Sequence, residues 1–230
     1  MESFLTNSVF WGAVFSLLFY EVGLLCKKKW KSPLFNPLLI SIILTILLLL
    51  VFKIPYSAYL PSAKYLNYLL TPATICLAIP LYEQIELLKK NIKAILAGIV
   101  SGVLTSMVTL LSLSALFGFT HEQYVTVLPK SITTAIGMEI SRLYGGNVSV
   151  TVIIIILTGI LGNIIAEPIC NLFHINDPIA RGVAIGTSSH AIGTTKANEI
   201  GTIEGAISGL SIAVAGICTV LISIVFNRLF

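Results

Sequence analysis

Long apolar runs, separated by short polar stretches, follow one another along almost the whole chain. A helix that crosses a bilayer needs ~20 mostly apolar residues, so 230 residues leave room for about eight such segments. Only 10% of the residues are charged and the mean hydropathy is +0.97, whereas a soluble domain has roughly 25% charged residues. A chain this poor in charge cannot solvate its own surface in water. The sequence therefore predicts one all-α integral membrane domain spanning residues 1–230.

The predicted segments are apolar stretches bounded by prolines, lysines or polar loops. They cover residues 4–25, 37–52, 63–82, 92–117, 125–143, 148–165, 179–200 and 203–226. Glu2 stands where a signal peptide would be basic, so the first stretch is predicted to be a spanning helix rather than a cleaved leader.

Two lysine clusters predict how the segments are oriented. They comprise Lys27, Lys28, Lys29 and Lys31 in one group and Lys89, Lys90 and Lys93 in the other. Basic residues beside spanning segments mark the cytoplasmic side, and the two segments between the clusters return the chain to the same side. The N-terminus is therefore predicted to lie outside. Each cluster adjoins an apolar run without an aromatic platform, so nucleic-acid binding is not expected.

Neither metal binding nor enzymatic activity is predicted. Cys26, Cys76, Cys170 and Cys218 are dispersed, without C-x-x-C pairs or histidines at metal-ligand spacing, so packed free thiols are expected and no cofactor. The run from Gly186 to His190 falls short of the serine-hydrolase pattern G-x-S-x-G, because His190 takes the place of the second glycine.

Segments 125–143 and 179–200 differ from the others because they carry glycine, proline, hydroxyl and ionisable residues inside apolar surroundings. In lipid every backbone N–H and C=O must be paired within the protein. Irregular backbone survives at depth only when it is packed in protein or lines a wet cavity. We expect both segments to be discontinuous helices, or re-entrant ones, that form a binding site in the membrane.

The free N–H groups at the start of a half-helix favour anions, and transporters with broken helices use them near the midplane. Neighbouring hydroxyls and cations would hold a carboxylate. The residues predicted to bind it are Lys130, Ser131, Thr133, Thr134, Gly137, Arg181, Ser188, Ser189, His190, Gly193, Thr194, Thr195 and Lys196. His190, Glu139 and Glu199 are predicted to carry a coupled proton.

Plainer roles stay open for the same residues. Serine and threonine hydroxyls often bond the carbonyl one turn back, and Lys130 and Arg181 could reach an interface by snorkelling. Lys196 and Glu199 are three residues apart and could form a simple ion pair on a helix surface. His190 could be structural.

Thr134-Ala135-Ile136-Gly137 resembles His190-Ala191-Ile192-Gly193, and each stretch is followed by an apolar helix. This match has two possible explanations, which are an internal inverted repeat and a chance similarity.

Several blocks of sequence resemble the LrgB/CidB family of bacterial membrane proteins. They include Leu70–Ala73, Ile79–Tyr82, Pro129–Thr134, Asp177–Gly182, Gly186–Thr194, Glu199–Gly201 and Glu204–Ala206. Ala135 departs from the family pattern, which has proline there, so the break at this point depends more on Gly137.

The resemblance implies two functions for a protein of the bacterial cytoplasmic membrane. Plant relatives move glycolate and glycerate, and bacterial ones are linked to pyruvate. We therefore expect a secondary transporter of small monocarboxylates such as pyruvate, glycolate or lactate, with residues 63–230 containing its core and residues 1–62 its scaffold. The alternative is a holin-like or antiholin-like modulator of murein hydrolases and autolysis, acting with a small LrgA/CidA-type membrane partner. A homodimer is expected.

Overall fold

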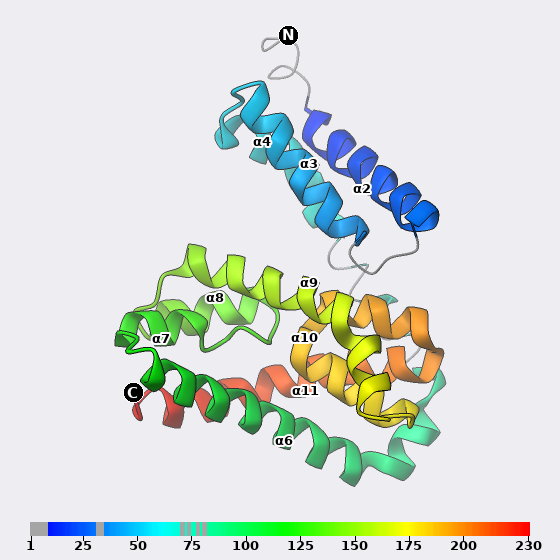
Figure 1. Cartoon of the computed structure of the whole chain (residues 1–230), viewed down its shortest axis with the longest axis vertical. Helices are drawn as coiled ribbons and strands as arrows, with labels where there is room; N and C mark the ends of the chain where they lie inside the picture. The colour runs from blue at the N-terminus through cyan, green and yellow to red at the C-terminus, as the bar shows by residue number, and fades with distance from the viewer. Residues whose placement is uncertain (1–8, 31–34, 70–71, 73–74, 77–78, 80–81) are drawn as a thin grey trace. The chain divides into compact units, whose positions relative to one another are not determined.

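The computed structural model describes residues 9–30, 35–69, 72, 75–76, 79 and 82–230, and every regular element in these ranges is a helix (Figure 1). The prediction of an all-α fold is confirmed for them. The chain divides into two compact units, residues 1–76 and 77–230. The prediction for the segment 63–82 falls partly on residues outside the described ranges.

The first unit is held together by small polar contacts between short helices. These helices are α2 (Trp11–Trp30), α3 (Pro37–Val51), α4 (Tyr56–Ala63) and the 3-10 helix η1 (Lys64–Leu69). Asn36 caps α3, since its Oδ1 accepts from Leu38 N at 2.9 Å. Ser62 Oγ accepts from Gly12 N at 3.1 Å, which ties α4 to α2. With 15 residues, α3 is only about 22 Å long and is shorter than the hydrocarbon core of ~30 Å.

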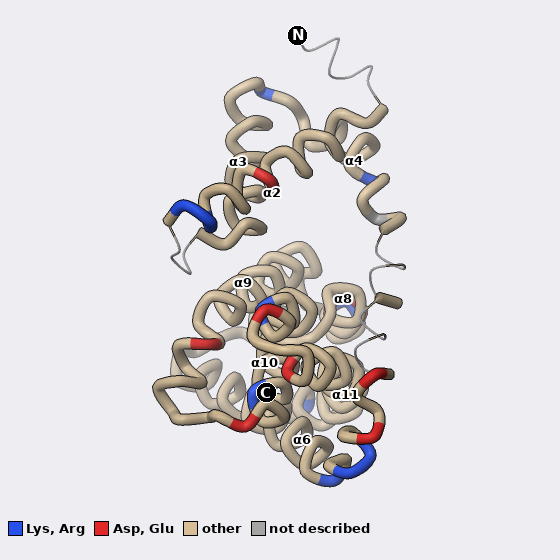
Figure 2. Tube along the Cα trace, turned by 90° about the vertical axis from the view of Figure 1, so that its right-hand side faces the viewer, with Lys and Arg blue, Asp and Glu red and all other residues tan. Residues whose placement is uncertain are grey.

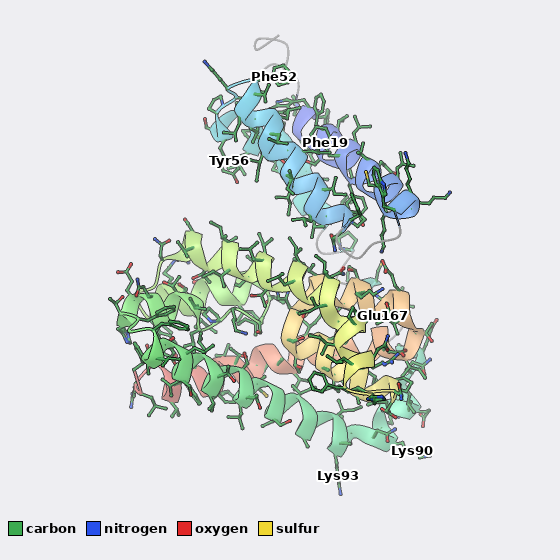
Figure 3. The ribbon with its side chains drawn as sticks, viewed as in Figure 1. Phe19, Phe52, Tyr56, Lys90, Lys93 and Glu167 are labelled. Carbon is green, nitrogen blue, oxygen red and sulfur yellow. The ribbon has the colours of Figure 1, made fainter. Side chains whose placement is uncertain are left out.

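The second unit contains the helices that are long and apolar enough to cross a membrane: α6 (Ile85–Leu116), α9 (Val148–Leu172) and α11 (Thr202–Phe226). Between them lie α7 (His121–Val127), α8 (Thr134–Leu143) and α10 (Pro178–Ile200). Ile95 and Ile99 of α6 and Ile207 of α11 belong to one hydrophobic core, and all three are fully buried. Lys90 and Lys93 extend outward from the first turns of α6 (Figure 3). Figure 2 shows several basic positions at this end of α6, among others elsewhere in the chain.

Helix α10 reverses its direction at His190, where φ is 42° and ψ is −142°. In the first arm of α10, Gly182 lies against Ile207 of α11 and Gly186 lies against Ser211. In these contacting pairs the residue numbers increase together along both helices, so this arm runs parallel to α11.

The second arm of α10 returns along α11 in the opposite sense. Thr194 Oγ1 lies 2.7 Å from Ser208 Oγ, and further along the arm Asn198 packs against Gly205. In these pairs the residue number increases along α10 while it decreases along α11, so the second arm runs antiparallel to α11. Residues 178–200 therefore form a helical hairpin whose tip is His190.

A second hairpin is formed by α7 and α8. Thr126 O of α7 accepts from Thr151 Oγ1 of α9 at 2.8 Å, and Ser141 Oγ of α8 lies 2.7 Å from the same hydroxyl oxygen. Nearer the tip, Gly137 contacts Pro129 and Ile155. The chain thus advances beside α9 as α7, turns at residues 128–133 and returns as α8.

The two hairpins point in opposite directions, because the first arm of α10 runs antiparallel to α9. Gly159 lies against His190 and Gly162 lies against Ser189. The arm α7, by contrast, runs parallel to α9. The tips of both hairpins therefore meet along one stretch of α9, from Ile155 to Gly162.

Both segments, 125–143 and 179–200, are interrupted, at residues 128–133 in the first and at His190 in the second. The expectation that Gly137 carries the first break is wrong, because Gly137 lies inside the regular helix α8. The matching Ala-Ile-Gly stretches lie at the start of the helix that follows each interruption. The number of membrane crossings and the internal repeat stay predictions. Three of the predicted segments, 92–117, 148–165 and 203–226, correspond to helices able to span a bilayer.

The hairpin in α10 can be tested by disulfide cross-linking. We expect Thr194→Cys and Ser208→Cys to form a disulfide in a background without native cysteines, because the two hydroxyls are 2.7 Å apart and a disulfide needs Cβ atoms about 3.5–4.5 Å apart. A straight α10 running on from the Gly182–Ile207 contact would instead bring residue 194 beside Thr219. Cross-linking of Thr194→Cys with Thr219→Cys, and none with Ser208→Cys, would contradict the hairpin.

Candidate functional site

Lys130 lies in the turn between α7 and α8, with its ammonium group directed at α6. Its Nζ donates to Ser106 Oγ at 3.1 Å and to Ser131 Oγ at 2.9 Å. Ser106 is close to the middle of the apolar part of α6. Among the residues that the structure describes, no carboxylate forms an ion pair with Lys130. The charge is therefore held by hydroxyl groups alone.

A cavity of about 730 Å³ lies between α6 and the first arm of α10 and includes Lys130 in its wall. Its lining is largely apolar and includes several hydroxyl groups, of which those of Ser106 and Ser131 contact the ammonium group. These hydroxyls belong to Ser101, Thr105, Ser106, Thr109, Ser131, Thr187 and Ser188. A mostly apolar cavity with a few convergent polar groups is typical of a small-molecule site.

A second cavity of about 470 Å³ lies between α9 and the first arm of α10. Lys130 also lines this cavity, together with Ser188, Ser189 and Cys170. Ser189 can approach α9 because Gly162 has no side chain there.

The hydroxyl groups at the tip of α10 already have protein partners. Ser188 Oγ donates to Ala184 O at 2.7 Å and lies 2.9 Å from Ser189 Oγ. Thr187 Oγ1 donates to Val183 O at 2.7 Å. These are the hydrogen bonds to the carbonyl one helical turn back that the sequence analysis gave as the alternative to ligand binding. A hydroxyl group has one proton, so a hydroxyl that donates to a backbone carbonyl must give up that bond, by rotation of its side chain, before it can donate to an anionic ligand.

His190 is buried and lines neither of the two cavities. Its Nε2 lies 3.0 Å from Ile155 O, and its ring rests on Gly159. Thr194 Oγ1 donates to His190 O at 3.0 Å. These contacts give His190 a structural part in closing the hairpin, and its role in carrying a proton stays a prediction.

The second arm of α10 is attached to α9 by polar side chains one helical turn apart. Lys196 Nζ is 2.7 Å from Glu167 and 3.5 Å from Glu199 (Figure 3 labels Glu167). Asn163 Nδ2 donates to Ile192 O at 2.9 Å and to Thr195 Oγ1 at 2.8 Å. The expected pair of Lys196 and Glu199 is present, while Glu167 and Asn163 were missed by the sequence reasoning.

The other predicted residues lie away from the two cavities. Arg181 donates to Ile175 O and, at 2.9 Å, to Asn171 Oδ1, so it holds the loop before α10. Glu139 pairs with Arg142, and its side chain is 68% exposed. The residues that line neither cavity are Thr133, Thr134, Gly137, Arg181, His190, Gly193, Thr194, Thr195 and Lys196, with Glu139 and Glu199.

The face of α6 that lines the larger cavity was also missed. It carries Gly98, Gly102, Thr105, Ser106 and Thr109, which recur at helical spacing. That periodicity was a usable signal, but the high apolarity of the helix concealed it.

The fold defines a helical membrane protein with cavities beside its interrupted helices. The chain belongs to the LrgB-like family, whose model matches residues 16–229. It is 36% identical to the holin-like protein CidB of Staphylococcus epidermidis over 210 residues, which is 91% of this chain and 92% of that protein. The holin-like protein CidB of Staphylococcus aureus is also 36% identical, over 211 residues and the same shares of both chains. No solved structure matches the chain.

The backbone at His190 gives a test of its structural role. Its φ of 42° and ψ of −142° belong to a region that is essentially restricted to glycine and costs other residues about 1–3 kcal/mol. We expect His190→Gly to be more stable to unfolding in detergent than His190→Ala by that amount, because both lose the ring's contact with Ile155 O. Ala191, the next residue, lies in regular helix, where alanine is more favourable than glycine. We therefore expect Ala191→Gly to lower the stability by about 1 kcal/mol. Equal stability of the two His190 variants would show that the hairpin does not hold this backbone.

Proposed function

We propose that this protein moves small monocarboxylate anions, such as pyruvate, glycolate or lactate, across the cytoplasmic membrane. The observation that carries the proposal is Lys130, a half-buried ammonium group without an acidic partner among the described residues, placed where two polar hairpin tips meet. A small carboxylate would supply the missing negative charge. The hydroxyls of Ser106, Ser131 and Ser188 would donate to its oxygens.

The opposed hairpins support an alternating mechanism in this proposal. If α9 crosses the bilayer, α7–α8 and α10 enter it from opposite sides and neither crosses. With Lys89, Lys90 and Lys93 in the cytoplasm, α7–α8 would enter from outside and α10 from the cytoplasm. Movement of either hairpin against α9 would then expose Lys130 to one side. Residues 1–62 keep the proposed role of scaffold.

Proton coupling is part of the proposal. Of the three residues suggested by the sequence, His190 is the one at the hairpin tip, where its ring contacts Ile155 O of α9 and its carbonyl accepts from Thr194 in the returning arm. Glu199 belongs to the ion-pair cluster on the returning arm, and Glu139 lies at the surface. A change in protonation at His190 would act directly on the position of the tip.

Uptake into liposomes tests the proposal. Purified protein should accumulate labelled pyruvate and glycolate, and Lys130→Gln should lower uptake at limiting substrate by about 10- to 100-fold, since a hydrogen bond to a charged group contributes about 1.5–3 kcal/mol. Lys93→Gln, at an exposed position on α6, is the matched control and should transport normally. Absence of uptake of any small carboxylate, with or without a proton gradient, would rule the proposal out.

The second candidate is a holin-like role in autolysis, with a small LrgA/CidA-type membrane protein as partner. The names of the relatives, holin-like protein CidB, favour this candidate directly, whereas support for carboxylate transport comes from the site. A homodimer is proposed for either function. The two functions are compatible if carboxylate flux alters membrane energetics and thereby autolysis.

Vesicle leakage distinguishes the two candidates. A lesion-forming protein should release an entrapped dye at high protein density, and Lys130→Ala and His190→Ala should leave the release unchanged, because a lesion does not need a specific anion site. A carboxylate transporter should retain the dye while the same substitutions reduce uptake. Release that is insensitive to both substitutions, without carboxylate uptake, would establish the holin-like role in place of transport.

A further inference from the structure

The cavity beside α6 and the cavity beside α9 share three lining residues. Lys130, Ala184 and Ser188 line the cavity beside α6 and also the cavity beside α9. The first arm of α10 thus passes between two spaces that share one ammonium group. Ala184 and Ser188 are one helical turn apart on this arm, so the shared wall is short.

The charge near the shared wall of the two cavities is positive, because it comes from Lys130. Among the described residues that line the cavity beside α9, Lys130 is the one that carries a charge. In the cavity beside α6 the lining also contains Asp177, but its carboxylate caps α10 by accepting from Ala180 N at 2.9 Å. Asp177 lies at the start of the arm, about two turns before Ala184. The shared region is therefore positive.

We propose that the two cavities are successive chambers of one anion path, that Lys130 lies at their junction, and that Cys170 lines the second chamber. The identity of the anion rests on the proposed function, but the connection between the chambers does not. An anion that leaves Lys130 on the α9 side would pass Ser189 and then Cys170. A cation would be excluded from the same route by the ammonium group.

Cys170 supplies a native reporter for this path. It is buried, and it lies on α9 two turns beyond Gly162, where Ser189 packs. In a chain with Cys26→Ser, Cys76→Ser and Cys218→Ser, Cys170 is the remaining thiol. It can be reacted with a sulfonate-bearing or a trimethylammonium-bearing methanethiosulfonate. In each case the thiolate forms a disulfide with the reagent and methanesulfinate leaves.

The expected result is charge selection at Cys170. Relative to a free thiol in solution, the anionic reagent should be favoured about tenfold over the cationic one, because Lys130 attracts it in a chamber of low dielectric. Lys130→Gln should lower the preference, while Arg181 and Glu167, the other charges that act on Cys170, stay in place. Lys93→Gln should leave the preference intact. A Cys218-only chain should show no dependence on Lys130, because Cys218 lines neither chamber. Ala166→Cys, in the second chamber and a chain without native cysteines, is a further reporter should Cys170 react slowly.

The outcomes separate the path from the transport function. A selectivity that depends on Lys130 without carboxylate uptake would support the path and refute the proposed substrate. Uptake that depends on Lys130, with equal reactivity of both reagents at Cys170 and Ala166→Cys, would show that the second cavity is not part of the route. No reaction with either reagent at both reporters would show that the cavity is filled by hydrocarbon, and would also overturn the inference.

Discussion

The need to pair every backbone polar group away from water determines how this structure is built. Each hairpin has a turn whose N–H and C=O groups lack helical partners, and both turns are placed against α9 rather than against lipid. Ile155 is the point where they meet, since its carbonyl contacts the ring of His190 and its side chain contacts Gly137. Helix α9 therefore serves as the inner wall for two irregular segments from different parts of the sequence.

Close approach to that wall depends on particular small residues. Gly162 leaves room for Ser189, and Gly159 leaves room for the ring of His190. On the other side of the α10 hairpin, a Cβ at Gly186 would lie 2.5 Å from Ser208 O, so the arm can approach α11 only with glycine there. Membrane helices associate mainly by such close packing, because lipid offers no hydrophobic drive between them. Gly186, one of the glycines that marked a broken segment in the sequence, is thus a point of close contact, while the break itself lies at His190.

The sequence was sufficient to predict an all-helical membrane chain, the long apolar helices and the two broken segments, because composition and local breaks determine these features. It could not show which polar residues come together. Lys130 and Ser188 are 58 positions apart and share two cavities only because the hairpins are opposed. Glu139 and Arg181 are, like Lys130, ionisable residues within the two broken segments. In the structure, however, they bond to nearby residues of the chain, Arg142 and Asn171. Spacing along a chain carries no information about such tertiary proximity unless a repeat reveals it.

The environment of Lys130 bears on the choice between a lesion and a transport site. A lysine at the centre of a membrane helix costs about 2.5–3.5 kcal/mol on insertion scales, and two serine hydroxyls offset only part of that cost. A bound anion would lower it further, and the ammonium group would in turn stabilise the anion. Any state in which the hairpin tips are closed around Lys130 should therefore favour occupancy by a small anion, and a state in which water reaches the ammonium group should favour release. A membrane lesion made by association of many chains does not need anion binding to be coupled to closure of the hairpin tips, whereas a carrier requires that coupling.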